Sequence, residues 1–236
     1  MAYAHHLLLA LPDDAQGVLK IALIVGFIVL SLSIHEWAHA WSAHLLGDDT
    51  AKNEGRMTPN PIVHIDPIMT IVVPAVLLIA SGGSFAFGGA KPVPVDPRNF
   101  KHPQGANAIV AAAGPLSNFL LAFVFFAALY ASVNLGGYHQ SQLLPQVLYI
   151  SAVANVALAV FNLIPIPPLD GSRVVMWLLP VRARMGYAML EQFGMVIIVV
   201  LLVTRVLSEP LTATVFSLLD WIEGIVQHVG RSLGLW

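Results

Sequence analysis

Hydrophobic residues occur in long runs along this chain, and polar residues gather in the short stretches between the runs. A helix rises about 1.5 Å per residue, so about 20 apolar residues cross the hydrocarbon core of a bilayer. The runs that predict spanning helices are about 18–46, 104–133, 145–163, 186–207 and 211–229. The pattern therefore favours a helical membrane protein.

A shorter apolar run at 68–80 contains Pro74 and is short for a helix that crosses a bilayer. It favours a re-entrant or tilted segment, because irregular backbone at membrane depth is tolerated only where protein covers it. Residues 85–95 predict a short β-hairpin, since Pro92 and Pro94 alternate there as on an edge strand. The predicted fold is an all-α integral membrane protein with about five to six transmembrane helices, a re-entrant segment and a short β-hairpin.

Composition supports the membrane assignment and narrows the chemistry. The 236 residues are 57% hydrophobic and only 10% charged, whereas a soluble domain carries about 25% charged residues. The net charge of −2 argues against nucleic acid as a partner. The chain has no cysteine, so a metal would need His, Asp or Glu ligands. We expect one membrane-embedded domain over 1–236, with a core at about 18–180 and a C-terminal helical pair at about 186–229.

The distribution of Lys and Arg predicts the orientation in the membrane. These residues cluster in three segments, 52–56, 91–101 and 173–184, and are absent from the loop 134–144. If 68–95 enters the bilayer and returns, all three clusters lie on the cytoplasmic side, as the positive-inside rule requires. This arrangement places the N-terminus outside and Arg231 inside. It predicts a multi-pass protein of the cell (inner) membrane.

The end of the first apolar run carries the chemistry, in the stretch His35-Glu36-Trp37-Ala38-His39. Histidines four residues apart on a helix lie on one face, so both can reach one ion. Glu36 lies beside them and can accept a proton from water. This is the H-E-x-x-H arrangement of zinc peptidases. Polar groups next to such an apolar run are costly in lipid and mark a working site.

A catalytic zinc site needs a third protein ligand, and Asp170 is the best candidate. It follows a helix that must break at Pro165, Pro167 and Pro168, and Gly171 permits an unusual backbone angle beside it. The predicted topology brings His35, His39 and Asp170 to a similar depth near the cytoplasmic side. His44, His64 and Asp66 are expected to have interfacial or loop-anchoring roles instead.

These motifs, taken together, resemble the site-2 protease family of intramembrane zinc metalloproteases, in its compact prokaryotic form. The matching pieces run in the same order from about 33 to 176, and include segments at 60–67 and 89–95. The main pieces are His35-Glu36-Trp37-Ala38-His39, Gly114-Pro115-Leu116-Ser117-Asn118 and Asn162-Leu163-Ile164-Pro165-Ile166-Pro167-Pro168-Leu169-Asp170-Gly171. One departure is that the His motif lies on the first helix, whereas better-known members have a helix before it.

The resemblance implies that His35, His39 and Asp170 bind one Zn²⁺ per chain and that Glu36 is the general acid/base. It also implies that Asn118 lies near the site, where it would donate hydrogen bonds to the substrate carbonyl or the developing oxyanion. The implied substrate is a transmembrane helix of another protein, cleaved within the lipid bilayer by zinc-activated water.

Two other functions fit parts of the pattern. A metal-ion transporter also places His and Asp within the membrane, but more often along several helices or with repeat symmetry. A catalytically inactive binding scaffold would not need Glu36. Zinc content together with cleavage of a model transmembrane substrate separates these possibilities from a peptidase.

Overall fold

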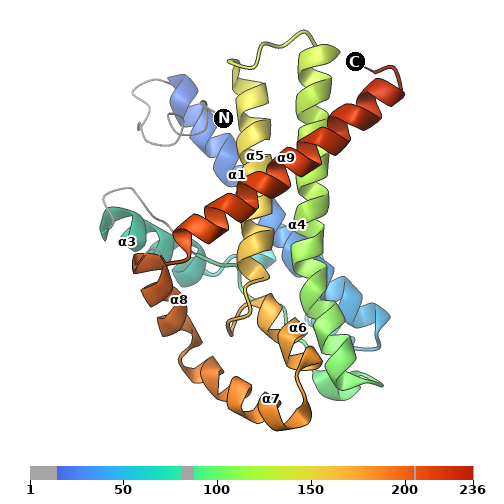
Figure 1. Ribbon diagram of the computed structural model, residues 1–236, viewed down its shortest axis with the longest axis vertical. Helices are drawn as coiled ribbons and strands as arrows, with labels where there is room; N and C mark the ends of the chain where they lie inside the picture. The colour runs from blue at the N-terminus through green and yellow to red at the C-terminus, as the bar shows by residue number, and fades with distance from the viewer. Residues whose placement is uncertain (1–14, 81–87, 205, 236) are drawn as a thin grey trace.

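A computed structural model describes residues 15–80, 88–204 and 206–235. Three helices dominate the fold, α1 (Ala15–Leu45), α4 (Pro103–Asn134) and α5 (Leu143–Asn162). Helices α4 and α5 pack side by side, and α1 crosses them at an angle (Figure 1). Each is long and apolar enough to cross a membrane. The predicted helices at 18–46, 104–133 and 145–163 are therefore confirmed within a few residues.

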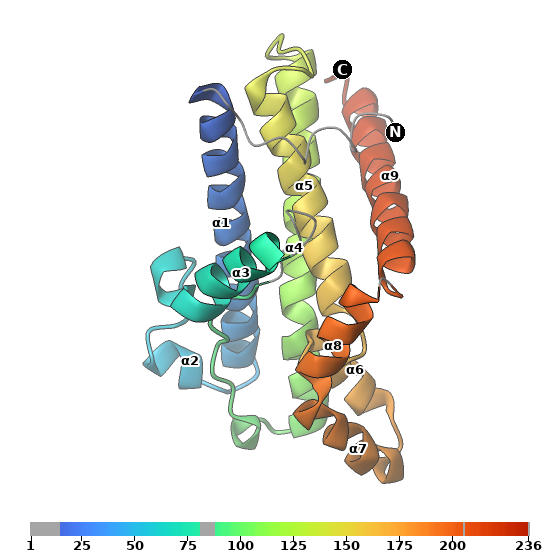
Figure 2. The same cartoon turned by 90° about the vertical axis from the view of Figure 1, so that its left-hand side faces the viewer.

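Short elements fill the chain between α1 and α4. They are α2 (Thr50–Asn53), η1 (Pro61–His64), η2 (Pro67–Val72), α3 (Val73–Ala80) and η3 (Pro97–Asn99). Figure 2 shows α3 lying across the long helices rather than alongside them. Asp66 is the N-cap of η2, because its Oδ1 accepts hydrogen bonds from the backbone N–H groups of Ile68 and Met69. That this segment enters the bilayer and returns stays a prediction.

The predicted β-hairpin at 85–95 is not confirmed. Residues 85–87 lie outside the described residues, and 88–95 form no strand. Proline at 92 and 94 removes two backbone donors, which limits ladder formation. Residues 88–95 instead form a connecting segment that is held by hydrogen bonds to several parts of the protein.

The chain after α5 departs from the predicted pair of spanning helices. It forms α6 (Asp170–Leu178), α7 (Val181–Ala188), η4 (Met189–Gln192), α8 (Gly194–Val203) and α9 (Ser208–Ser232). Residues 181–192 and 194–203 are long and apolar enough to form one span only when they are taken together, and this pair is bent by 69°. The described residues thus hold three helices suited to cross a membrane, or four with this pair. The predicted count of five to six is not confirmed.

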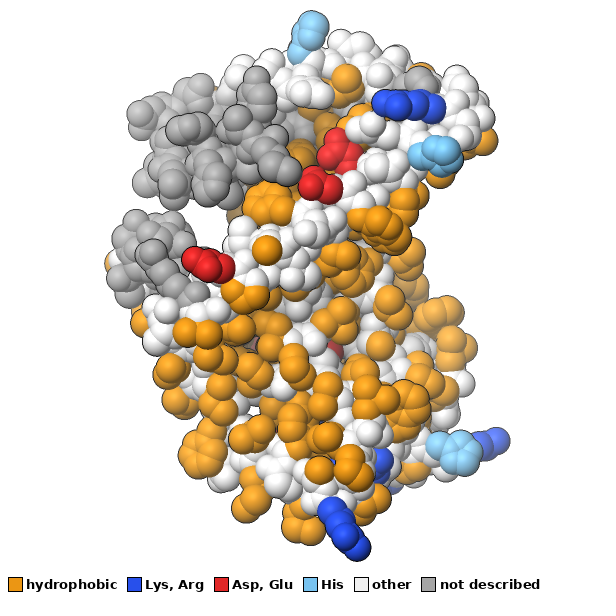
Figure 3. Space-filling view, in the orientation of Figure 1, with side chains coloured by type: hydrophobic (Ala, Val, Ile, Leu, Met, Phe, Trp, Pro, Cys, Tyr) orange, Lys and Arg blue, Asp and Glu red, His pale blue; other side chains and the backbone are white. Residues whose placement is uncertain are grey.

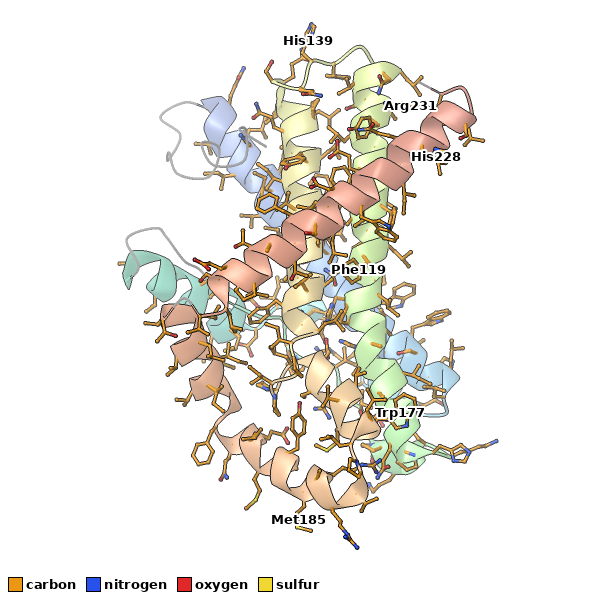
Figure 4. The ribbon with its side chains drawn as sticks, viewed as in Figure 1. Phe119, His139, Trp177, Met185, His228 and Arg231 are labelled. Carbon is orange, nitrogen blue, oxygen red and sulfur yellow. The ribbon has the colours of Figure 1, made fainter. Side chains whose placement is uncertain are left out.

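The C-terminal path also differs from the predicted orientation. In Figure 1, α8 rises only part of the way and α9 continues to the end where the C-terminus lies. Arg231 consequently lies at the same end as His139 (Figure 4). The basic segments around α2, η3 and α7 lie toward the opposite end (Figure 2). The prediction that Arg231 shares a side with these basic segments is wrong. Helix α8 has only 10 residues and is too short to cross a bilayer, and α9 continues in the same direction instead of returning.

An apolar core joins α9 to α4 and α5. It comprises Ala122, Phe125, Phe126, Leu148, Ala152, Val156, Val215, Leu219, Ile222 and Val226. The α9 members recur at helical spacing, so they form one face of an otherwise mixed helix. The outer surface is largely hydrophobic in its middle and lower parts (Figure 3), as lipid contact requires.

Candidate metal centre

Two imidazoles converge on the inner face of α1. Nε2 of His35 and Nε2 of His39 lie 3.0 Å apart, with the two rings nearly perpendicular at 84°. Their residues are 4% and 8% exposed. The four-residue spacing on one helix face produces this convergence, as the sequence predicted.

Asp170 completes the cluster from a distant part of the chain. Its Oδ2 lies 3.2 Å from Nε2 of His35 and 3.4 Å from Nε2 of His39. Asp170 is the first residue of α6, directly after the irregular segment 163–169 that follows α5. A Cβ atom on Gly171 would lie 2.1 Å from the Leu163 carbonyl oxygen. Glycine therefore allows α6 to begin against the end of α5, which brings the carboxylate to the histidines.

The remaining ring nitrogens fix the tautomer of each histidine. Nδ1 of His39 lies 2.7 Å from the carbonyl oxygen of Val110, which can only accept a hydrogen bond. Nδ1 of His35 lies 2.6 Å from Oδ1 of Asn118. Each Nδ1 therefore carries the hydrogen, and each Nε2 presents its lone pair to the cluster. Metal-binding histidines are held in this way, by an acceptor at the far ring nitrogen.

Gly114 of α4 leaves space beside the imidazoles. A Cβ atom at this position would lie 2.4 Å from Nε2 of His39 and 2.5 Å from Nε2 of His35. Any side chain here would therefore displace the two imidazoles from the positions in which their Nε2 atoms converge. From the sequence, Gly114 was identified only as part of the motif Gly114-Pro115-Leu116-Ser117-Asn118, and its position beside the imidazoles was not predicted.

Glu36 lies next to the cluster in sequence and points to the segment 88–95. Its Oε2 accepts a 2.9 Å hydrogen bond from the backbone N–H of Val93. Arg56 is buried and donates from Nη2 to the carbonyl oxygens of Lys91 (2.7 Å) and Pro92 (3.4 Å). The segment beside Glu36 is thus held in place from two sides.

The cluster has the geometry of a zinc site. Zinc–nitrogen distances of about 2.1 Å in a tetrahedron separate two ligand atoms by about 3.4 Å. The Nε2–Nε2 and Nε2–Oδ2 distances of 3.0, 3.2 and 3.4 Å are close to this value. Two lone pairs and a carboxylate at such distances repel one another unless a metal ion or a proton lies between them. Two nitrogens and one oxygen also form a donor set that zinc accepts. The residues therefore fit a zinc ion.

The other polar residues considered from the sequence lie elsewhere. His44, in the last turn of α1, forms an ion pair with Asp49, which lies beyond the end of this helix. His64 is buried, and its Nε2 contacts the carbonyl oxygen of Thr58. Within the described part of the chain, His35, His39 and Asp170 form the one group suited to a metal.

An all-helical protein with three apolar spanning helices, an H-E-x-x-H helix and a converging aspartate belongs to the class of membrane metallopeptidases. Comparison with known proteins gives the family. The sequence profile of Peptidase family M50 matches residues 132–205. The chain is 41% identical over 216 residues to "Putative zinc metalloprotease YwhC" of Bacillus subtilis (strain 168), covering 86% of this chain and 92% of that protein.

A second relative extends the same result. The chain is 30% identical over 204 residues to "Putative zinc metalloprotease Rip2" of Mycolicibacterium smegmatis, covering 84% of this chain and 73% of that protein. The comparison with solved structures gave no significant match. The chain belongs to peptidase family M50, the site-2 protease family, and it is a zinc-dependent peptidase of a membrane.

Proposed function

We propose that this protein is an intramembrane endopeptidase that cleaves transmembrane segments of other membrane proteins. His35, His39 and Asp170 hold one Zn²⁺, and Glu36 is the general acid/base. The observation that supports this proposal best is the convergence of the two Nε2 atoms and Oδ2 of Asp170 within 3.4 Å, beside Glu36, on a helix suited to cross a bilayer.

The chemistry divides between the metal and the protein. Zinc, when bound, polarises the scissile carbonyl and lowers the pKa of a water molecule toward about 7. Glu36 accepts the proton of that water and later passes it to the leaving amine. The N–H of Val93 orients the carboxylate of Glu36 for these transfers. Val110 and Asn118 keep the histidine lone pairs directed at the ion.

Asn118 has a supporting role in this proposal. Its amide contacts His35 through Oδ1 and Asn155 through Nδ2, and the residue is fully buried. The predicted hydrogen bond from Asn118 to the substrate oxyanion stays a prediction, because it needs the second Nδ2 hydrogen to reach the substrate.

The site also suggests where the substrate comes from. A helix hides its peptide bonds in backbone hydrogen bonds, so a transmembrane substrate must unwind locally before cleavage. The substrate approaches through the bilayer, in the half that holds the basic segments. We assign this half to the cytoplasmic side of the inner membrane by the positive-inside rule. The whole chain, 1–236, acts as one membrane-embedded unit.

Purified protein with a model transmembrane substrate tests this function. Glu36→Gln should retain one zinc per chain and lose cleavage, because the amide cannot accept the proton. His39→Ala should lose both zinc and cleavage. Metal flux in proteoliposomes without proteolysis would instead identify a transporter. Zinc binding by the wild-type protein with neither cleavage nor flux would identify an inactive scaffold.

A further inference from the structure

A line of buried polar side chains runs from the metal cluster into the apolar interior. It joins Asn118 of α4 to Asn155 of α5 and to Ser31 of α1. These residues are 0%, 1% and 1% exposed. Phe119, which follows Asn118 in sequence, lies near the middle of α4 in Figure 4 and marks the level of this line. Burying polar groups among three apolar helices is costly, so a structural or chemical purpose is required.

The hydrogen bonds in this line have one consistent direction. Nδ1 of His35 donates to Oδ1 of Asn118 over 2.6 Å, and Nδ2 of Asn118 donates to Oδ1 of Asn155 over 3.1 Å. Nδ2 of Asn155 donates to Oγ of Ser31 over 2.9 Å and to the carbonyl oxygen of Ser151. The hydroxyl of Ser31 donates to the carbonyl oxygen of Phe27, so its lone pairs face Asn155.

Each amide in the line could in principle turn by 180°, but its hydrogen-bond partners oppose the turned orientation. If Asn118 turned by 180°, its Nδ2 would face the N–H of His35 and its Oδ1 would face Oδ1 of Asn155. Nδ1 of His35 would then lose its acceptor, and the tautomer with the lone pair on Nε2 would no longer be favoured. Asn155 is kept from turning in the same way, because the carbonyl oxygen of Ser151 accepts only and Ser31 already donates elsewhere.

We propose that Asn155 and Ser31 are positioning residues that set the orientation of the Asn118 amide and thereby the tautomer of His35 that binds zinc. This inference rests on the proposed role of His35 as a ligand. Neither residue touches the ion or the substrate; both act through Asn118. The expected effect is on zinc affinity, since outer-shell partners of a ligating histidine change metal affinity by about 10- to 100-fold.

Two serines on α1 provide a matched test. Ser31 and Ser33 are equally buried, and each donates a 2.8 Å hydrogen bond to the carbonyl four residues earlier. Only Ser31 also accepts from Asn155. Ser31→Ala should weaken zinc affinity by roughly 3- to 10-fold, the value of one hydrogen bond. Ser33→Ala should leave it unchanged. Zinc affinity is measured on the full chain in detergent, by competition with a chelator of known affinity.

A second background separates positioning from general packing. In Asn118→Ala, the amide through which Ser31 is proposed to act is absent, so no orientation remains for Ser31 to set. The effect of Ser31→Ala on zinc affinity should disappear there, as a double-mutant cycle would detect. Asn155→Leu, which leaves Nδ2 of Asn118 without its acceptor, should weaken zinc affinity by about 10- to 100-fold in the wild-type background.

The outcomes divide between the inference and the function beneath it. If wild-type protein binds no zinc, the proposed function fails. If wild-type protein binds zinc but Ser31→Ala matches Ser33→Ala, the inference alone is overturned. An undiminished Ser31→Ala effect in the Asn118→Ala background also overturns it, because the effect would then be one of packing.

Discussion

The backbone N–H of Val93 donates a 2.9 Å hydrogen bond to Oε2 of Glu36. This contact joins the proposed general acid/base on α1 to a segment 57 residues away in sequence. The segment is anchored on both sides of Val93, because Arg56 binds the carbonyl of Lys91 and Asp48 accepts from the N–H of Asp96. The orientation of Glu36 therefore depends on the anchoring of this segment.

Removing the donor at residue 93 should impair proton transfer while sparing the metal. Val93→Pro has no N–H, and the neighbouring residues 92 and 94 are already prolines, so extended backbone is expected there. A hydrogen bond to a charged group contributes about 1.5–3 kcal/mol, so kcat should fall by roughly tenfold or more. Zinc content should not change. Val93→Ala retains the N–H and should retain activity, and equal kcat values for the two variants would remove any role for this hydrogen bond.

Adding a single methyl group at residue 114 should exclude the metal. The new Cβ atom would lie 2.4–2.5 Å from both Nε2 atoms, so the imidazoles would have to leave the positions in which they converge. Gly114→Ala should lower the zinc content of purified protein to near zero, as measured by metal analysis. Gly105→Ala lies on the same helix, and its Cβ would be 3.6 Å from the nearest atom, Nε1 of Trp177. This control should bind zinc normally; full zinc content in Gly114→Ala would contradict the assigned position of the ion.

Asp48 should stabilise the loops at the basic end of the protein in a pH-dependent way. Burial of its carboxylate acts to raise its pKa, but hydrogen bonds from Thr50, Asn99 and the N–H of Asp96 outweigh burial and hold the pKa below the usual 3.8. Because folding lowers this pKa, the stabilisation is fully present above pH 3.8 and is lost as the pH falls through the lower folded value.

The change Asp48→Ala leaves the partly exposed donors of Thr50, Asn99 and Asp96 without their acceptor, and it should reduce stability by about 1–3 kcal/mol at neutral pH. The melting temperature in detergent should fall accordingly, and the difference from the wild type should shrink below pH 3.8. Asp49→Ala provides the control, since that side chain is 54% exposed and should contribute little. A difference that stays constant down to pH 2 would argue against a pH-dependent contribution of the Asp48 carboxylate.

Local periodicity was sufficient for the parts of the site that lie on one helix. Spacing of four residues placed His35 and His39 on one face without any tertiary information. The helix break before Asp170 was evident from its prolines, and the predicted topology placed Asp170 at the depth of the two histidines, which it contacts. The side of the membrane on which they lie stays a prediction. The buried Asn155 carried a signal that was not used, because a polar amide within an apolar helix is costly and usually has a partner.

Apart from the meeting of Asp170 with the histidines, features that depend on contacts between distant segments were not predicted. The segment 88–95 has the alternation of an edge strand, but its donors and acceptors contact Glu36, Met69 and His64 instead of a paired strand. The runs 186–207 and 211–229 have enough apolar residues for two spans. Their actual path depends on a 69° bend and on the packing of α9 against α4 and α5, which hydropathy does not encode.

The order of residues by itself determined the class of protein, the membrane setting and the identity of the three converging side chains, because these follow from apolar run length, from the H-E-x-x-H motif and from the proline break before Asp170. Only the tertiary structure decided that Gly114 faces the imidazoles, that Val93 holds Glu36, and that Asn118 faces His35 with Asn155 and Ser31 behind it. The reason is that hydrogen-bond direction and close approach between helices arise from packing in three dimensions, where residues far apart in the chain become neighbours.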